Sequence, residues 1–357
     1  MGNGPVTTPA GNGASGLPAV LAIDGGNSKT ALALVAADGS LLAVAGGDGT
    51  KGVGDLPGSL RLVGGLTERA QAQAGLTGRP AAAHMSACMA NADLPDEEEA
   101  LTAALAAEGW TRSTKVFNDT FAVLRAGLTG GGWGVGVTCG AGINCVGLAP
   151  DGRTTRFLSL GPISGDWGGG YELGGQALWW AVRDEDGRGP RTALREAVAA
   201  HFGVPTVRDV TIAIHRGELR RGDIRKLTPV LFQVAEKGDE VARAVVSKQA
   251  DEVATMALTA MRRLDLTGLA TPVALGGGVL AARDPLLIAG IETRLAGEAP
   301  AAAIHIVDVP PVVGAALLGL DHIGAEPAAE QRLRAAYAGP QPVPASGAAP
   351  GQPARGA

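Results

Sequence analysis

The chain has 357 residues, of which 46% are hydrophobic and 18% are charged, and its formal net charge at pH 7 is −5. This balance is typical of a folded globular protein with room for two domains, each with its own core. The negative charge and the low aromatic content of 3% argue against nucleic acid as the main partner, because such proteins need basic surfaces or stacking platforms.

Both ends of the chain have the composition of disordered segments. We expect residues 1–17, rich in Gly, Pro and Thr, to be disordered, and they lack the basic segment and apolar core of a signal peptide. No apolar run approaches the roughly 20 residues that span a bilayer, so we expect a cytoplasmic protein without a membrane segment. We expect residues 323–357 to form a largely disordered tail, since Gly339 to Ala357 is mostly Pro, Ala and Gly.

The first half alternates strand and helix patterns. Apolar runs over 19–23, 31–36 and 41–45, separated by turns, predict three antiparallel strands. Apolar spacing then predicts, in order, a helix at 56–74, a strand at 81–87, a helix at 97–107, a strand at 115–117 and a helix at 120–128. We therefore expect a first domain over residues 18–130.

The second half repeats this order around an insertion. The predicted strands lie at 134–138, 143–148, 154–160, 272–275 and 304–307, with helices at 284–295 and 312–320 and clear inserted helices at 191–201, 224–235 and 239–264. Each half has a glycine turn after its first strand, and this repetition predicts two α/β domains that face each other across a cleft. The second domain should span residues 131–322.

The turn Asp24–Thr30 has the chemistry of a phosphate loop. Glycines let backbone amides approach an anion closely, and the hydroxyls of Ser28 and Thr30 add donors, while Asp24 can hold Mg²⁺ through water. Taken alone, the turn also fits an ordinary hairpin, because Asp-Gly-Gly is common there. It is not a Walker A loop, because the glycine before Lys29 is absent.

Several motifs in order resemble the actin, hexokinase and Hsp70 ATPase superfamily, and within it the BadF/BadG/BcrA/BcrD-type ATPases that include N-acetylglucosamine kinases. The resemblance covers about residues 18–322 and rests on a first phosphate loop (Asp24–Thr30), a second phosphate loop (Cys139–Cys145), a sugar segment (Gly165–Gly169) and an adenosine loop (Gly276–Gly278). It implies two ribonuclease H-like domains, each a mixed five-stranded sheet with helices, flanking a nucleotide cleft.

The resemblance also implies roles for individual residues. The nucleotide would be bound by Gly25, Gly26, Asn27, Ser28, Lys29, Thr30, Thr138, Gly140, Ala141, Gly142, Gly276, Gly277 and Gly278. The sugar would be bound by Asp119, Asn144, Gly165, Asp166 and Trp167, with Asp119 as the catalytic base. Two alternatives stay open at this point: Asp119 also fits a helix N-cap, and Trp167 also fits simple packing.

Two departures from the family pattern bear on function. The second phosphate loop has Gly140-Ala141-Gly142 where the family usually has Gly-Thr-Gly, so a hydroxyl is missing; we hypothesise that Thr138 partly replaces it. The family's Asn-containing substrate segment after the third strand is not evident in Gly47-Asp48-Gly49-Thr50-Lys51.

The function that the resemblance implies is an ATP- and Mg²⁺-dependent phosphotransferase acting on the 6-hydroxyl of N-acetylglucosamine or a related amino sugar, in a homodimer. The acceptor stays open among N-acetylglucosamine, glucosamine and N-acetylmuramic acid. One alternative is an ATPase activator of 2-hydroxyacyl-CoA dehydratases, but Cys88, Cys139 and Cys145 sit in surroundings that suggest reduced, buried thiols rather than cluster ligands. Another is a non-catalytic sugar or nucleotide sensor, which the Ala141 departure keeps open.

Overall fold

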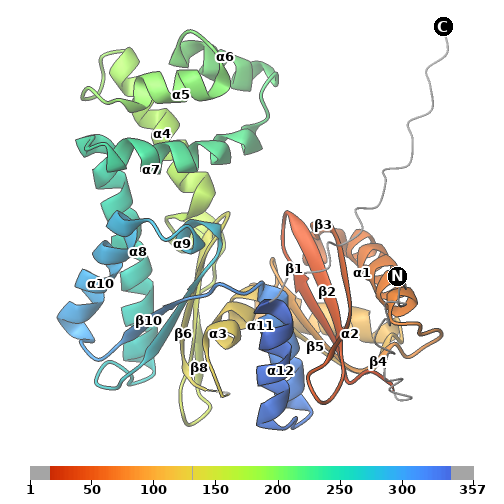
Figure 1. Ribbon diagram of the computed structural model, residues 1–357. Coiled ribbons are helices and arrows are strands. Elements are labelled where there is room, and N and C mark those ends of the chain that lie inside the picture. The colour runs from red at the N-terminus through yellow and green to blue at the C-terminus, as the bar shows by residue number, and fades with distance from the viewer. Residues whose placement is uncertain (1–16, 131, 339–357) are drawn as a thin grey trace, which may run out of the picture.

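The computed structural model describes residues 17–130 and 132–338. It contains two α/β domains, each built on a five-stranded sheet, and a helical extension that rises from the second domain (Figure 1). The strand orders are β3-β2-β1-β4-β5 and, in the second sheet, β10-β9-β6-β7-β8. In each sheet the central strand pairs antiparallel with one neighbour and parallel with the other. The predicted fold class and internal repeat are confirmed.

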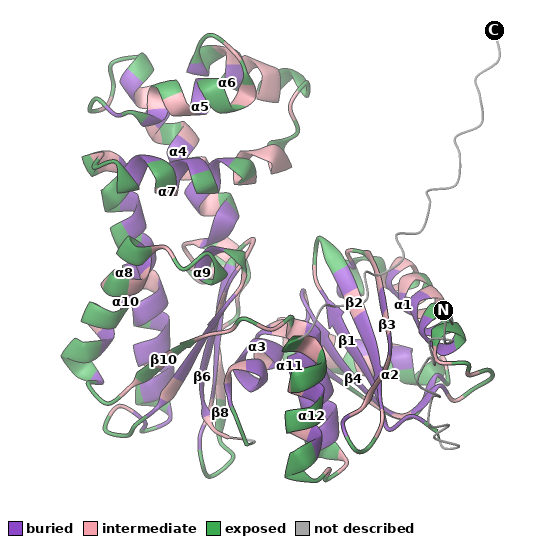
Figure 2. Cartoon of the chain, in the orientation of Figure 1, coloured by how far each residue is buried: buried purple, intermediate pink, exposed green. Residues whose placement is uncertain are grey.

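The first sheet is covered on both faces. Its elements are β1 (Val20–Gly25), β2 (Lys29–Val35), β3 (Leu41–Asp48), α1 (Leu56–Gln73), β4 (Ala82–Met89), α2 (Pro95–Ala107) and β5 (Thr111–Asn118), with the short 3₁₀ helix η1 (Gly52–Asp55). Leu21 and Ile23 enter a core that Val63 and Leu66 of α1 and Leu101 of α2 also form. Val20 and Ala22 point to the opposite face, so β1 is buried throughout, and the four residues 20–23 that precede Asp24 are all apolar (Figure 2).

The second domain carries the insertion between its third and fourth strands. Its sheet comprises β6 (Gly134–Cys139), β7 (Ile143–Leu148), β8 (Thr154–Arg156), β9 (Pro272–Gly276) and β10 (Ala303–Ile306), with α9 (Gly278–Ala281) and α10 (Pro285–Glu298). The strand predicted over 154–160 is shorter because Ser159 has a φ of 56° and its hydroxyl bonds to the carbonyl of Ile143.

The insertion forms the helical extension. It contains η2 (Gly161–Ser164), α4 (Gly169–Glu185), α5 (Leu194–Phe202), α6 (Val207–Arg216), η3 (Arg221–Leu227), α7 (Thr228–Glu236) and α8 (Glu240–Arg263). The three predicted inserted helices correspond to α5, to η3 with α7, and to α8. The helices α4 and α6 are additional, and α4 has little helical signal because its first seven residues include four glycines.

The two domains are joined by crossed helices. Helix α3 (Asp119–Gly127) follows the first sheet, yet its Leu124 packs with Val146 and Ala274 of the second sheet. Helix α11 (Pro311–His322) follows the second sheet and packs on the first, beside Val20 (Figure 1). A Cβ atom at Gly314 would lie 1.9 Å from the carbonyl oxygen of Ala122, so only glycine permits this close approach.

The described part of the C-terminal tail is ordered, against expectation. Helix α12 (Pro327–Ala338) buries Ala329 and Leu333 against the first domain. Glu330 of α12 accepts hydrogen bonds from Arg125 of α3, which also pairs with Asp321 at 2.6 Å. The expectation of a largely disordered tail is therefore wrong for residues 327–338, because an ion-pair cluster and an apolar face dock this helix. Residues 1–16 and 339–357, for which disorder was expected, lie outside the described residues.

Candidate active site

A cleft of about 1240 Å³ is lined by residues of both domains and of the helical insertion. Predicted site residues that line it are Asp24, Gly26, Asn27, Ser28, Lys29, Asp119, Thr138, Gly140, Ala141, Gly142, Asn144, Asp166, Gly277 and Gly278. Five others do not line it: Gly25, Thr30, Gly165, Trp167 and Gly276. Motifs that are far apart in the sequence, from Asp24 to Gly278, therefore meet in one space.

The first phosphate loop is the tight turn between β1 and β2. The N–H of Gly26 donates to the carbonyl of Lys29 at 3.0 Å, which leaves Asn27 and Ser28 exposed at the tip. Gly25 lies beneath the loop, because a Cβ atom there would be 2.5 Å from the sulfur of Met89. Thr30 is buried and contributes no surface to the cleft.

The segment Gly47–Lys51 supports this loop. The N–H of Thr50 donates to the carbonyl of Gly26 at 3.0 Å, and the Thr50 hydroxyl bonds to Ser59 at 2.6 Å. A Cβ atom at Gly49 would lie 2.2 Å from the carbonyl oxygen of Asn27. None of the five residues lines the cleft, so here they hold the phosphate loop in place.

Two carboxylates, the buried Asp24 and the partly buried Asp119, line the cleft beside the first phosphate loop. Burial, with a further contribution from the negative charge of Asp119, raises the pKa of Asp24 to about 7, although Lys29 acts in the opposite direction. Burial likewise raises the pKa of Asp119, against the lowering effect of its hydrogen bonds with Thr120. Two carboxylates in this setting favour the binding of a cation between or beside them.

Asp119 is not the N-cap of α3. That position belongs to Asn118, whose side-chain oxygen accepts from the N–H of Thr120 at 3.0 Å. The carboxylate of Asp119 has one weak side-chain contact, with the Thr120 hydroxyl at 3.4 Å. The capping alternative for Asp119 is therefore removed, and its carboxylate remains available to the cleft.

Asn118 also connects the two domains next to Asp119. Its side-chain oxygen accepts from Nδ2 of Asn144 at 3.1 Å, and its own Nδ2 donates to Asp93 at 2.9 Å. Burial and the charge of Asp119 raise the pKa of Asp93 to about 6. Asn144 of the second phosphate loop is thereby held against the strand end that carries Asp119.

The sugar segment places only one of its predicted side chains in the cleft. One oxygen of Asp166 accepts from the N–H of Gly161 at 3.0 Å and from the hydroxyl of Ser164 at 2.6 Å, which fixes its orientation. Trp167 instead packs on the hydrophobic core of the second domain, and the ammonium of Lys248 lies 4.0 Å from the centroid of its ring. The packing interpretation of Trp167 fits this position better than a sugar contact.

The second phosphate loop and the adenosine loop meet closely. Gly277 has a φ of 85°, and a Cβ atom there would lie 2.5 Å from the backbone of Cys139. The hydroxyl of Thr138, a residue that lines the cleft, is buried and makes no hydrogen bond to the described residues. A buried hydroxyl without a partner beside a phosphate loop is available to donate a hydrogen bond to a bound ligand.

Sequence reasoning missed several polar residues of the cleft. Nδ2 of Asn91 donates to the side-chain oxygen of Asn27 at 2.6 Å, which ties the end of β4 to the first phosphate loop. Asp93 and Arg225 also line the cleft, the latter from the insertion. The positive φ of Asn91, 61°, has no sequence signal beyond the tolerance of Asn for that conformation, and Arg225 is distant from every motif.

The residues fit Mg²⁺ in the form in which it accompanies a nucleotide. Within residues 17–130 and 132–338 there is no group of three or more His, Cys, Asp and Glu side chains able to hold a metal by themselves. Mg²⁺ is usually held by one or two carboxylates together with substrate phosphates and water, and Asp24 and Asp119 supply that number.

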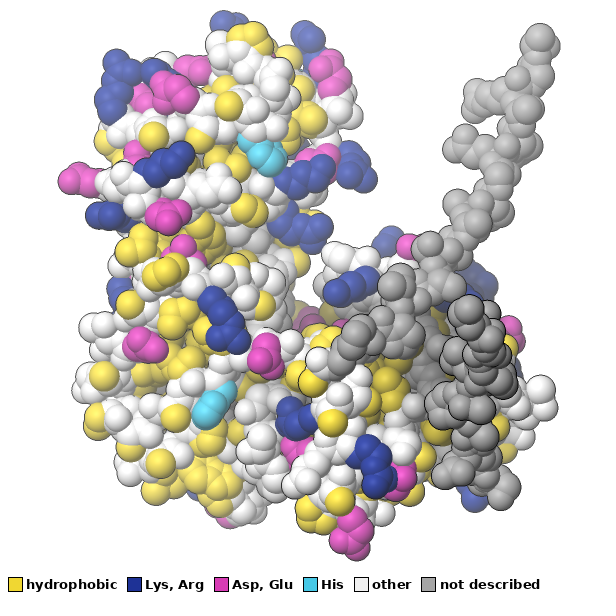
Figure 3. All heavy atoms as spheres, in the orientation of Figure 1, with side chains coloured by type: hydrophobic (Ala, Val, Ile, Leu, Met, Phe, Trp, Pro, Cys, Tyr) yellow, Lys and Arg dark blue, Asp and Glu magenta, His cyan; other side chains and the backbone are white. Residues whose placement is uncertain are grey.

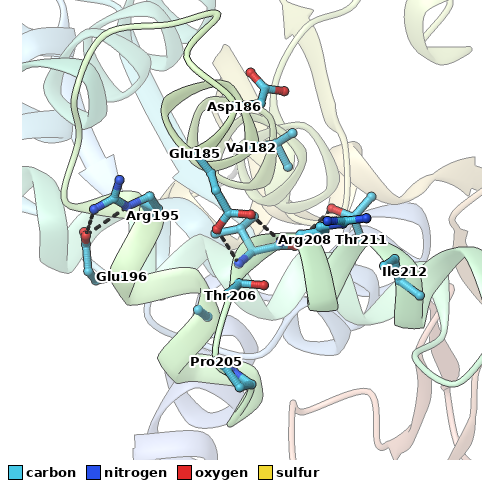
Figure 4. A pocket seen from close by; sticks show the side chains of 12 residues that line it. Val182, Glu185, Asp186, Arg195, Glu196, Pro205, Thr206, Arg208, Thr211 and Ile212 are labelled. Carbon is cyan, nitrogen blue, oxygen red and sulfur yellow. Dashed lines mark hydrogen bonds and ion pairs between the residues drawn. The ribbon is translucent and has the colours of Figure 1, made fainter.

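A second pocket, of about 720 Å³, lies within the insertion (Figure 4). Its central carboxylate, Glu185, already accepts from the N–H groups of Val207 and Arg208 at the start of α6. Arg195 in its wall pairs with Glu196 at 2.5 Å. These groups stabilise the helix arrangement and leave the interdomain cleft as the candidate active site.

Other surfaces add little. On the face shown in Figure 3, basic and acidic side chains are interspersed, without a broad basic area. In the described part of the chain, no helix is both long and apolar enough to cross a bilayer.

The fold and the cleft define a two-domain protein of the actin and hexokinase type, in which a glycine turn from each domain lines the cleft. A model of the BadF/BadG/BcrA/BcrD ATPase family matches residues 21–319, and the chain belongs to this family.

Two relatives are about a quarter identical to this chain over the residues that align. An N-acetyl-D-glucosamine kinase of Dictyostelium discoideum is 26% identical over 208 residues, which are 58% of this chain and 65%, just under two thirds, of that protein. An N-acetylmuramic acid/N-acetylglucosamine kinase of Clostridium acetobutylicum is 26% identical over 265 residues, which are 73% of this chain and 85% of that protein.

Solved structures share the fold. A candidate N-acetylglucosamine kinase from Chromobacterium violaceum superposes with a TM-score of 0.66 at 25% identity, covering 85% of this chain and 99% of that one. A ROK family glucokinase from Streptomyces griseus, crystallised with glucose and AMPPNP, has a TM-score of 0.53 at 15% identity and covers 84% of this chain and 98% of that one.

Proposed function

We propose that this protein is an ATP-dependent sugar kinase that phosphorylates the 6-hydroxyl of N-acetylglucosamine or a closely related amino sugar. Family membership and two sugar kinases among the relatives support the class of reaction. The observation that carries the proposal is the carboxylate of Asp119, which faces the cleft, is not used to cap its helix, and lies beside the first phosphate loop.

Asp119 is the catalytic base in this mechanism. It accepts the proton of the sugar hydroxyl as that oxygen forms a bond to the γ-phosphorus of ATP, while the bond from that phosphorus to the bridging oxygen breaks and ADP leaves with the electron pair. A pKa raised by burial makes the carboxylate a stronger proton acceptor than an ordinary aspartate.

Asn144 and Asp166 position the sugar. The contacts of Asp166 with Gly161 and Ser164 engage one of its oxygens, so the carboxylate is oriented in advance to accept hydrogen bonds from sugar hydroxyls. Asn144 is held by Asn118, and its amide keeps a further N–H donor for a hydroxyl or acetamido oxygen.

The two glycine turns hold the nucleotide in this proposal. Asn27, Ser28 and Lys29 present donors from the first domain, and the Thr138 hydroxyl offers one from the second. Asp24 and Asp119 would hold Mg²⁺, which would neutralise phosphate charge there.

An activator that shares an iron–sulfur cluster between subunits fits poorly, because Cys88, Cys139 and Cys145 are all free and buried. Burial raises the pKa of each thiol, to about 12 for Cys139, which disfavours the thiolate that ligates iron.

The experiment is Asp119→Asn with Asp96→Asn as the matched control, since Asp96 is an exposed aspartate in the same domain, outside the cleft. We expect Asp119→Asn to lower kcat for sugar phosphorylation about 10²- to 10⁴-fold, because it removes the base. Binding of the ATP analogue AMPPNP should survive, and Asp96→Asn should behave as the wild type. Full activity of Asp119→Asn on a panel of amino sugars would refute the assignment.

A further inference from the structure

Arg225 reaches across the cleft from the insertion to the first phosphate loop. It lies on η3 of the second domain, and its Nη1 is 3.3 Å from the hydroxyl oxygen of Ser28. Its side chain lines the cleft together with both phosphate loops. A guanidinium group therefore occupies the space between the two turns that face the nucleotide.

Glycines of α4 make this position possible. A Cβ atom at Gly174 would lie 2.2 Å from the carbonyl oxygen of Ile224 and 3.2 Å from Cα of Arg225, so η3 can dock there only against glycine. A Cβ atom at Gly170 would lie 3.0 Å from Cγ of Arg225. The aliphatic part of Arg225 is thus packed against α4, and its guanidinium lies 5.2 Å from the ring centroid of Tyr171.

The same contacts bring Arg225 to the second phosphate loop. The N–H of Gly170 donates to the carbonyl of Gly140 at 2.8 Å, and the N–H of Tyr171 donates to that of Ala141 at 3.0 Å. The residues that hold Arg225 are therefore hydrogen-bonded to the loop in which Ala141 supplies no side-chain donor.

Arg225 is the cation of η3 that is directed to the cleft. Its neighbours Arg220 and Lys226 both pair with Asp223, at 3.1 and 3.0 Å, whereas no carboxylate of the described residues pairs with Arg225. The described cleft lining holds seven carboxylates but only three cations, namely Lys29, Arg225 and Arg283. A triphosphate entering so acidic a cleft needs a fixed positive charge close to its phosphates.

We propose that Arg225 binds the terminal phosphates of ATP and supplies, from the insertion, the contact that Ala141 cannot make. Its guanidinium exchanges the weak contact with Ser28 for paired hydrogen bonds to phosphate oxygens, a geometry that suits its planar fork. This inference rests on the proposed use of ATP, but it does not depend on which sugar is the acceptor or on Asp119 as the base.

The test is calorimetric titration of the full-length chain with Mg²⁺ and either AMPPNP or AMP. Arg225→Ala should weaken AMPPNP binding about 10- to 100-fold and leave AMP binding unchanged, because AMP lacks the terminal phosphates. Arg225→Lys should give an intermediate loss, since it keeps the charge but not the fork. Arg221→Ala is the matched control: it removes the same charge from η3 at an exposed position outside the cleft, and both affinities should stay at the wild-type value.

Three results would overturn the inference. Arg225→Ala could lose equal affinity for AMPPNP and AMP, which would indicate a distorted insertion. AMPPNP binding could be unchanged in that variant, or the wild type could fail to bind AMPPNP. Arg225-dependent AMPPNP binding in a chain that phosphorylates no sugar would support the inference and reject the proposed kinase. The two proposals therefore fail separately.

Discussion

Replacing Asp24 by Asn should stabilise the ligand-free protein at neutral and alkaline pH. Asp24 is buried at the end of β1, and burial together with Asp119 raises its pKa from 3.8 to about 7. An unfolded chain holds the same carboxyl at its ordinary pKa, so the folded state binds the extra proton between these two values.

The difference between the folded and unfolded pKa values gives the sign and size of the effect of Asp24→Asn on stability. A raised carboxyl pKa favours the folded state below pH 3.8, and this contribution is lost as the pH rises through about 7. A difference of about 3 pKa units corresponds to about 4 kcal/mol, at 1.36 kcal/mol per unit. The amide introduced by Asp24→Asn carries no charge at any of these pH values, so the variant does not lose this stability as the pH rises.

The assay is urea unfolding of wild type and variant from pH 4 to pH 8.5 without ligands. The difference in free energy of unfolding reports Asp24 together with its interaction with Asp119, since the remaining titrating groups occur in both proteins. We expect the variant's advantage to be near zero at pH 4 and to rise by about 4 kcal/mol by pH 8.5. A difference that does not change with pH, or a less stable variant at pH 8.5, would refute the reasoning. Asp96→Asn, at an exposed site, should show no such rise.

Two further variants test the phosphate loop and the docked C-terminal helix. Thr138→Val removes the unpaired hydroxyl at the second phosphate loop. It should raise KM for ATP or lower kcat about 10-fold, because one hydrogen bond to a charged group contributes about that factor. Steady-state kinetics unchanged from wild type would exclude Thr138 as a phosphate ligand. Glu330→Ala leaves the buried Arg125 with Asp321 as its one carboxylate partner among the described residues. It should lower the free energy of unfolding, measured by urea unfolding, by about 2–3 kcal/mol. Gln331→Ala, at an exposed position of α12, should change this free energy little. Burial alone would raise the pKa of Glu330, but hydrogen bonds from Arg125 and Arg334 lower it overall, so the Glu330 contribution should be present above the ordinary pKa of 4.5 and be lost as the pH falls below it. An unfolding free energy of Glu330→Ala equal to that of Gln331→Ala would show that the pair with Arg125 contributes nothing.

The sheets and their glycine turns were predictable because their signals are local. The buried central strand Val20–Gly25 is mostly apolar and runs into a glycine turn, and the strand Gly134–Cys139 likewise runs into one. The repeat then placed both turns on one cleft, since equivalent strands of two similar domains end at equivalent edges. Asp119 was found for the same reason, because it follows the last strand of the first domain.

The remaining features depend on contacts between distant segments. Arg225 enters the cleft because η3 docks on two glycines of α4 about 50 residues earlier, and nothing in the segment Arg221–Leu227 encodes that docking. Helix α12 is held by Arg125, about 200 residues away in the sequence, and nothing in its own segment indicates that contact. The resemblance of its segment implied that Trp167 binds the sugar, yet its ring packs on the core of the second domain and lies beside Lys248 of α8.

The first sheet explains why Asp24 and Asp119 act on each other. Asp24 lies near the end of β1 and Asp119 directly follows β5, and both strands run parallel to β4, so their carboxyl ends meet at one edge of the sheet. The negative charge that contributes to the raised pKa of Asp24 therefore comes from the same domain. The second domain reaches this edge through α3, which Asp119 begins and which packs on the second sheet, and through Asn144, which donates to Asn118. Because a bound cation relieves the repulsion between two carboxylates, occupancy of the cleft should lower the pKa of Asp24 and remove the destabilisation that its charge causes in the ligand-free protein.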